Sequence, residues 1–278
     1  MMIDKIHVVI PYVDRYDLTN RMLEVLSENS DDINVILINN GSSEPSESLV
    51  VPKFSNVSVI TNDENTGCLN TIKQGLELVG DDDLMVFMHN DVLVWENHWD
   101  SRIRKEFDDE QRLGLAGFFG APGVAMDGGR IFAHSNMIGK EWGTIGRLHG
   151  ALMTEVCSAA VLDSLCMIFR VKALKQLGIP PHWPPHHWFD RLFCLHFIDN
   201  GWYVATIGVA FDHAGGSTAT AYNDFTVKWA KEYSGKDLGF EEANNMLYLA
   251  GYDIFWETYG QRLALVSDGD YHYQWRSP

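Results

Sequence analysis

The sequence predicts an α/β fold, because short apolar segments typical of buried strands alternate with amphipathic segments typical of helices over the first third of the chain. The length of 278 residues is enough to bury a substantial core, and no change of composition marks a second domain. A hydrophobic share of 46% and a charged share of 21% are ordinary for a folded protein. We therefore expect one domain over residues 1–235, with residues 236–278 forming a mostly helical appendage packed on it.

The first third contains the clearest elements. We expect strands at residues 8–10, 35–38, 57–60 and 84–88, and helices at residues 18–27 and 68–79. Ligands of such α/β sheets bind at the carboxyl ends of the strands. The first ~95 residues are therefore predicted to form a nucleotide-binding half.

The remaining chain is less regular at first. Residues 114–150 are rich in glycine, which predicts irregular, mobile connections, and residues 120–150 are a candidate lid that becomes ordered around a ligand. Beyond them, an apolar segment over 159–169 and helices over 171–177 and 189–200, ended by Gly178 and Gly201, restore a regular pattern. The apolar run at 204–209 and a mostly helical segment over 222–259 complete it.

Charge and composition limit the function. The net charge of -17 argues against a broad basic surface for nucleic acid. An acidic protein that binds a diphosphate needs positive charge near the phosphates, which a divalent cation can supply. The four cysteines have no C-x-x-C spacing and are expected to be free thiols in a reducing compartment. The N-terminal segment lacks signal-peptide features, and no apolar run reaches the ~20 residues of a transmembrane segment, so we expect a cytoplasmic protein.

Three local patterns suggest chemistry. Asp91 follows the expected strand at 84–88, where its carboxylate could bind a hard cation, although an Asn-Asp turn explains the pattern as well. Asp190 lies at the start of the helix at 189–200, where a first-turn charge is also ordinary. His213 lies before two glycines and could reach a metal or be a structural histidine. Each pattern is ambiguous alone, and their occurrence together in one order is what supports a functional site.

Further segments extend these patterns into an ordered series. They are 8–15 (VVIPYVDR), similar to VVIPTYNR; 36–44 (ILINNGSSE), similar to IVVDNGSSD; 62–67 (NDENTG), similar to N-x-x-N-x-G; 89–92 (HNDV), at the place of a DxD motif; 161–164 (VLDS), similar to VLDG; 187–202, similar to HFYDIDLCLR…GW; and His213 with 215–217, similar to H…GGS. Over residues 6–232 the series resembles glycosyltransferase family 2 and its GT-A relatives.

The resemblance implies a GT-A fold, in which a Rossmann-like nucleotide-binding half merges with an acceptor-binding half around a mixed central sheet. It implies a nucleotide-sugar donor, expected to be a UDP-sugar, and inversion at the anomeric carbon with Asp190 as general base. Asp91 and His213 would hold Mn²⁺ or Mg²⁺. The residues expected to line the nucleotide site are Pro11, Tyr12, Asp14, Asn39, Asn65, Gly67, His89 and Asn90.

Departures from the family pattern leave alternatives open. Asn39 replaces the base-reading aspartate, Leu192 replaces a second acidic residue, and His89 replaces the first DxD carboxylate, so His89 is left to contact either ribose or metal. Such changes also fit a protein that binds a nucleotide-sugar without turning it over. A nucleotidyltransferase is a third reading, although no glycine-rich basic loop follows the first strand.

The acceptor and the oligomeric state stay open. A glycan, a protein side chain, a small molecule or a hydroxymethylated DNA base could each supply the acceptor hydroxyl, and net acidity disfavours DNA. Trp183, Trp188 and Trp202 are candidates for packing on a sugar, and a place in the core is at least as well supported for each.

Overall fold

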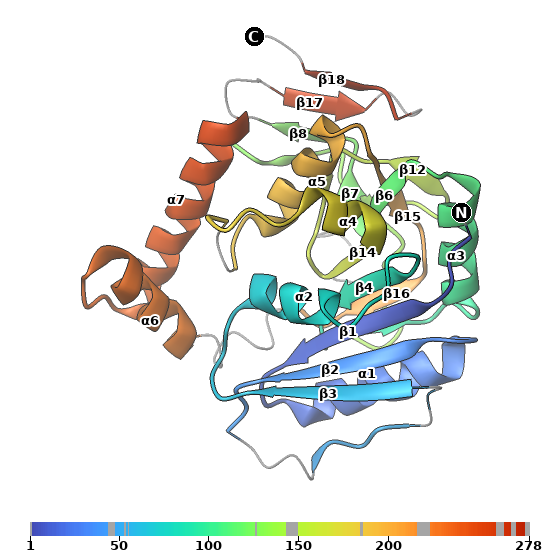
Figure 1. Cartoon of the computed structure of the whole chain (residues 1–278), viewed down its shortest axis with the longest axis horizontal. Helices are drawn as coiled ribbons and strands as arrows, with labels where there is room; N and C mark the ends of the chain where they lie inside the picture. Colours follow the sequence, from blue (N-terminus) through green and yellow to red (C-terminus); the bar gives the residue numbers. More distant parts are fainter. Residues whose placement is uncertain are drawn as a thin grey trace.

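An eight-stranded mixed sheet forms the centre of the molecule, in the order β12-β15-β6-β14-β4-β1-β2-β3 (Figure 1). This computed structural model describes residues 2–43, 48–52, 54, 56–125, 127–142, 150–183, 186–215, 223–259, 264–267 and 271–275. The fold is the predicted α/β fold with a mixed central sheet.

The nucleotide-binding half has the predicted strands and helices. Its parallel strands are β1 (Ile6–Tyr12), β2 (Asn34–Asn40), β3 (Asn56–Asn62) and β4 (Leu84–Met88), and its helices are α1 (Tyr16–Asn29) and α2 (Cys68–Leu76). Val8 and Ile10 of β1 pack in the same core as α1, whereas Val9 between them packs with α2. Strands β1, β2 and β4 are therefore buried on both faces, which explains why they are largely continuous apolar runs, whereas the edge strand β3 is partly exposed.

The second half joins the sheet through antiparallel pairing. It contains β6 (Leu113–Gly117), β12 (Val156–Ser158), β14 (Cys166–Arg170) and β15 (Tyr203–Ile207), with helices α3 (Trp99–Asp109), α4 (Val171–Leu177) and α5 (Phe189–Asp199). Strand β14 lies between β4 and β6 and is antiparallel to both. This strand connects the two halves, so residues that follow β4 lie next to residues from the second half.

Three smaller sheets position the loops around the central one. The first pairs β5 (Val92–Val94) with β16 (Phe211–His213). The second has the order β11 (Ala151–Leu152), β10 (His134–Ser135), β7 (Phe119–Ala121), β13 (Val161–Leu162). The third has the order β18 (Tyr273–Trp275), β17 (Ala264–Ser267), β8 (Gly123–Ala125), β9 (Arg130–Ile131).

The expectation of irregular chain over residues 114–150 is wrong for much of that segment, because β7 to β10 and all but the first residue of β6 lie within it. Its glycines allow close packing. A Cβ atom on Gly120 would lie 2.4 Å from Thr206 Oγ1 and 2.8 Å from the Val161 carbonyl oxygen, and one on Gly117 would lie 2.7 Å from the Cys166 carbonyl oxygen. Residues 143–149 of the candidate lid lie outside the described residues.

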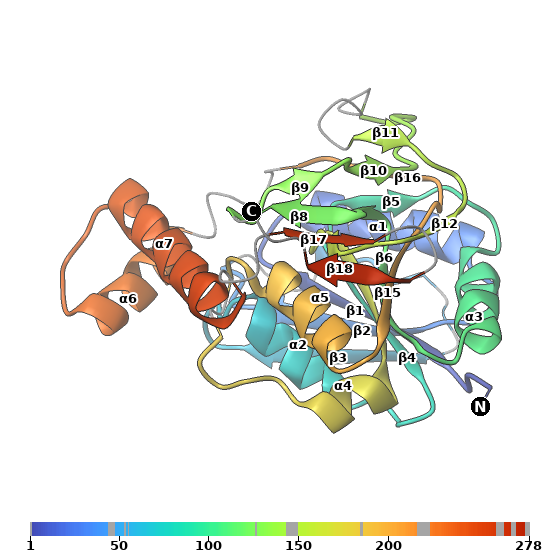
Figure 2. The same cartoon turned by 90° about the horizontal axis from the view of Figure 1, so that it is seen from above.

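The C-terminal part contains helices and strands. Helices α6 (Asn223–Ser234) and α7 (Phe240–Tyr259) pack together at one side of the molecule (Figure 2). Strand β17 then pairs with β8, so residues 236–278 contribute to a sheet with the preceding domain in addition to the expected helix. Among the described helices, none combines the length and apolar character needed to cross a membrane.

Candidate active site

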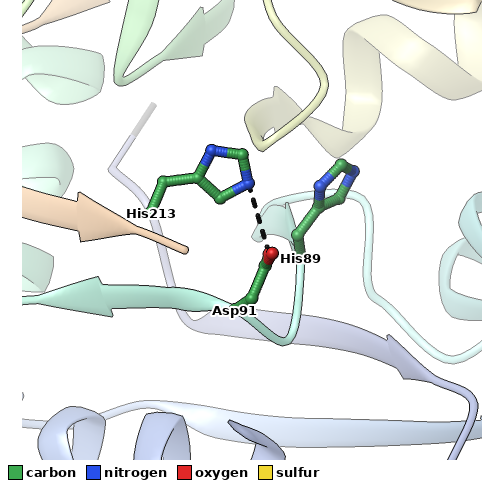
Figure 3. Close-up of side chains that lie close together, drawn as sticks. All are labelled: His89, Asp91 and His213. Carbon is green, nitrogen blue, oxygen red and sulfur yellow. Dashed lines mark ion pairs between the residues drawn. The ribbon is translucent and has the colours of Figure 1, made fainter. Parts of the chain in front are cut away.

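Three side chains meet where β4 ends. His89 and Asp91 lie in the turn between β4 and β5, and His213 ends β16, which pairs with β5 so that His213 lies opposite Val92. One potential ligand atom from each of His89, Asp91 and His213 lies within 4.8 Å of the others. His213 Nε2 is 3.3 Å from Asp91 Oδ1 (Figure 3). The two predicted metal ligands are thus adjacent, and His89 joins them.

The two imidazoles of the cluster have opposite pKa shifts. Burial lowers the pKa of His89, and its Nε2 is buried without a hydrogen-bond partner among the described residues. Burial also disfavours the charged form of His213, but the hydrogen bond and charge of Asp91 outweigh burial and raise the pKa of His213. Imidazole nitrogen and carboxylate oxygen are both common ligands of divalent metal ions in proteins. The donor set therefore fits a divalent cation.

Asp190 is the second residue of α5, and the residue before the helix, Trp188, adopts a left-handed backbone with φ of 67°. Asp190 as a whole residue is 6% exposed. Oδ1 accepts hydrogen bonds from the Arg191 backbone N–H at 2.8 Å and from Arg191 Nη1 at 3.1 Å. Oδ2 accepts one from Arg130 Nη2 at 3.1 Å. Two guanidinium groups therefore offset the charge of this buried carboxylate.

The loops after β1 and β2 are tied together by side chains predicted to line the nucleotide site. Asn39 Oδ1 accepts a hydrogen bond from the Ser42 backbone N–H at 2.8 Å, and Ser42 Oγ accepts one from the Asp14 backbone N–H at 2.8 Å. Asp14 accepts two more from Ser43. Asp14 has φ of 48°, so this network holds a left-handed backbone at the end of β1.

A second network ties the loop after β2 to the turn before α2. Asn40 donates to Asn65 Oδ1 at 2.8 Å and accepts from the Thr66 backbone N–H at 3.0 Å. Asn65 Oδ1 also accepts from the Gly67 backbone N–H at 3.0 Å. Gly41 lies so close to this turn that a Cβ atom would be 2.5 Å from the carbonyl carbon of Glu64. The predicted residues Asn65 and Gly67 are therefore fixed next to Asn40, the residue that follows Asn39.

Three other predicted nucleotide-site residues lie close to the core. Tyr12 is 2% exposed and its ring lies 5.6 Å from that of Tyr16, and burial raises the pKa of Tyr12 to about 12. Asn90 donates a hydrogen bond to Thr19 Oγ1 on α1 at 3.0 Å and is buried. Pro11 is partly exposed at the end of β1. The Tyr12 and Asn90 side chains therefore anchor the loops that surround the site.

Several residues of the site were not predicted from the sequence. Arg130, Asp163 and Asn40 all bond to predicted site residues or their neighbours, but only Asp163 and Asn40 fall in segments with a recognisable pattern. Of the tryptophans considered for sugar binding, Trp183 and Trp188 are buried in the core. Trp188 packs against Tyr248, Tyr252 and Phe255 of α7. Gly216 and Ser217 of the H…GGS segment lie outside the described residues.

Comparison with known proteins identifies the family. The sequence model described as "Glycosyl transferase family 2" matches residues 7–178. The chain belongs to glycosyltransferase family 2. A search of curated proteins gives no match.

Solved structures of other proteins share the fold of this chain. S. aureus TarS residues 1–349 has a TM-score of 0.51 and 13% sequence identity, over 93% of this chain and 73% of that one. GalNAc-T7 with UDP, GalNAc and Mn²⁺ has a TM-score of 0.53 and 12% identity, over 82% of this chain and 49% of that one. The protein is thus a glycosyltransferase of GT-A fold, as the sequence predicted.

Proposed function

We propose that this glycosyltransferase moves a sugar from a UDP-sugar to an acceptor hydroxyl with inversion, and that His89, Asp91 and His213 hold the divalent cation it uses. The cluster of these three side chains within 4.8 Å carries the proposal. Its position at the carboxyl end of β4, next to the Asn39 and Asn65 networks, is where an α/β sheet binds a nucleotide. The Mn²⁺ and UDP named with GalNAc-T7 are consistent with it.

The donor set favours Mn²⁺ over Mg²⁺. Imidazole nitrogen suits transition metals, whereas Mg²⁺ prefers oxygen ligands and retains its water. With two imidazoles and one carboxylate, the cluster has only one side chain of the kind that Mg²⁺ prefers. When bound, the cation supplies positive charge that stabilises the departing nucleoside diphosphate.

Asp190 has the role of general base in this proposal. The acceptor oxygen forms a bond to the anomeric carbon, the bond from that carbon to the diphosphate oxygen breaks, and the acceptor proton passes to an Asp190 oxygen. Attack opposite the leaving group inverts the anomeric configuration. Arg130 and Arg191 each place a positive charge within hydrogen-bond distance of this carboxylate, which offsets the cost of burying its charge.

The two polar networks have the role of shaping the nucleoside site. They fix the backbone of the loops after β1 and β2 and of the turn before α2 before the donor binds. A site that is already ordered loses less conformational entropy when it binds its ligand. The acceptor is any molecule with a suitably placed hydroxyl, and the acidity of the chain disfavours DNA.

The test is a thermal-shift screen of UDP, GDP and their sugar derivatives with Mn²⁺, with Mg²⁺ and with EDTA. A ligand that binds the folded state raises the melting temperature by mass action. We expect UDP and at least one UDP-sugar to raise the melting temperature most in Mn²⁺, less in Mg²⁺ and little in EDTA. We also expect the protein to release UDP from that UDP-sugar. Equal stabilisation in EDTA would contradict the cation site. Binding without any UDP release, in the presence of candidate acceptors, would favour a protein that only binds the nucleotide-sugar.

A further inference from the structure

Arg130 connects the proposed base to the rest of the site. Its Nη2 donates to three oxygens: Asp163 Oδ2 at 2.8 Å, Asp190 Oδ2 at 3.1 Å and the Leu162 carbonyl at 3.1 Å. The guanidinium also lies over the Phe119 ring, 5.0 Å from its centroid. One nitrogen therefore bridges two carboxylates, while the guanidinium packs on the Phe119 ring.

The connection continues to the metal cluster. Asp163 Oδ1 accepts a hydrogen bond from the Leu165 backbone N–H at 3.0 Å, and the Leu165 carbonyl accepts one from the His89 backbone N–H at 2.9 Å. A continuous series of hydrogen-bonded groups thus runs from Asp190 through Arg130 and Asp163 to His89. A shift of Arg130 would alter the distance between the base and the cation ligands.

We propose that Arg130 is a positioning residue, which holds the Asp190 carboxylate in the orientation needed to accept the acceptor proton. The inference rests on the proposed role of Asp190. Without Arg130, Asp190 and Asp163 lose the cation between them and repel each other, while Arg191 still holds Asp190 from its other side. The Asp190 carboxylate then turns away from the position fixed by two arginines.

Electrostatics agree with this geometry. Burial alone would raise the pKa of Asp163, but the charge of Arg130, the Leu165 N–H and the two nearby histidines lower it overall. Arg130 thus keeps a buried carboxylate ionised a short distance from the base, and the four side chains Arg130, Arg191, Asp163 and Asp190 carry no net formal charge together. An isolated surface ion pair contributes little, whereas breaking a buried, connected one leaves an uncompensated charge.

The support for Arg130 comes from the third small sheet. Arg130 begins β9, which pairs with β8, and β8 pairs in turn with β17. The turn of this hairpin also contacts α5, because Arg191 Nε donates to the Gly128 carbonyl at 2.9 Å. A Cβ atom on Gly128 would lie 2.1 Å from Trp188 Cζ3, so the hairpin is packed against the N-terminus of α5. The contact between the hairpin and α5 therefore fixes the positions of Arg130 and Arg191 relative to each other.

The experiment is a double-mutant cycle with Arg130→Met, Asp190→Asn and the combined variant, and Arg130→Lys as the conservative change. Arg112→Met is the matched control, because Arg112 also lies over an aromatic ring, that of Tyr203, and bonds to a backbone carbonyl, but outside the site. UDP-glucose, UDP-galactose and their N-acetylhexosamine counterparts are first compared as donors, and the one that releases UDP fastest is used. The two readouts are the rate of UDP release from that donor and the affinity for UDP in the presence of Mn²⁺. Melting temperatures establish that each variant is folded.

We expect Arg130→Met to lower kcat by about 10- to 100-fold, with KM for the UDP-sugar and Kd for UDP changed by less than about threefold, since misplacement of a reacting group costs turnover more than binding. Arg130→Lys should retain an intermediate kcat, because a lysine keeps the charge but loses the planar fork. In the Asp190→Asn background, Arg130→Met should cause no further loss.

The outcomes separate this proposal from the proposed function. A large loss in Asp190→Asn together with normal turnover in Arg130→Met overturns the role of Arg130 and leaves the base in place. An equal loss from Arg130→Met in both backgrounds also overturns it, because the arginine would then act independently of Asp190. Normal turnover in Asp190→Asn refutes the base itself. If Arg130→Met does not fold, Arg130→Lys must show the same split between kcat and binding, and loss of UDP binding in that variant overturns the proposal.

Discussion

Replacing Gly41 by alanine tests whether the close contact between the loops after β2 and β3 shapes the nucleotide site. Gly41 has φ of +86°, and an added Cβ atom would lie 2.5 Å from the Glu64 carbonyl carbon and 2.6 Å from the Asn65 nitrogen. Backbone atoms cannot move aside as a flexible side chain can. A residue other than glycine in such a conformation costs about 1–3 kcal/mol. The clash adds about 1–3 kcal/mol, as overpacking usually does.

Gly178 is the matched control, because it has φ of +71° and an added Cβ atom would meet nothing within 4 Å. Gly178→Ala should therefore cost the conformational part alone. With a shift of about 2–4 °C per kcal/mol, Gly41→Ala should melt several degrees below Gly178→Ala. It should also weaken binding of UDP with Mn²⁺ by about tenfold or more, whereas Gly178→Ala leaves that binding unchanged. Equal melting temperatures and equal UDP affinities in the two variants would refute the argument.

Three further predictions concern the metal cluster, the buried histidines and the glycine-rich strands. His89→Ala should lower the affinity for Mn²⁺ in the presence of UDP by about tenfold or more, measured by calorimetry, and an unchanged affinity would exclude His89 as a ligand. Burial, with the charges of His187 and His89, lowers the pKa of His186 well below 6.5. Below pH 6.5 the unfolded chain therefore binds more protons than the folded protein, and the free energy of unfolding should fall on acidification. His186→Gln should make the free energy of unfolding in urea less dependent on pH, and an unchanged pH dependence would contradict this. Hydrogen exchange should be slow at Gly117 in the protein without ligand, because β6 is a buried strand of the central sheet; rapid exchange there would restore the mobile segment expected from the sequence.

The sequence predicted the nucleotide-binding half well because its signals are local. Strands β1 and β4 are buried on both faces and are therefore continuous apolar runs, which mark a strand without knowledge of its neighbours. Asp91 and His213 were predicted as a pair because each lies in a recognisable motif. Whether His89 contacts metal or ribose could not be decided in this way. The structure places it beside both predicted ligands, and the assignment to the metal is our proposal.

The features that sequence reasoning missed depend on distant residues. Arg130 bonds to side chains 33 and 60 positions away and lies in no motif, so only the folded chain shows its partners. Glycines in a mobile loop and glycines in a tightly packed strand have the same local pattern. The neighbours Thr206 and Val161, which come from other strands, are what distinguish Gly120 as a packing glycine. The strands after α7 were likewise missed, because β17 pairs with β8 from the first half of the sequence and β18 pairs with β17.

The pairing of β17 with β8 affects how the enzyme reaches its native state. These strands are separated by roughly 140 residues. Closing so long a loop lowers the entropy of the chain before the contacts between the strands can compensate, so their pairing is slow. The β1 to β4 unit has much shorter connections and can assemble earlier. During refolding, β17 is therefore expected to be among the last strands to pair, and the β8–β9 hairpin that carries Arg130 keeps one unpaired edge until it does.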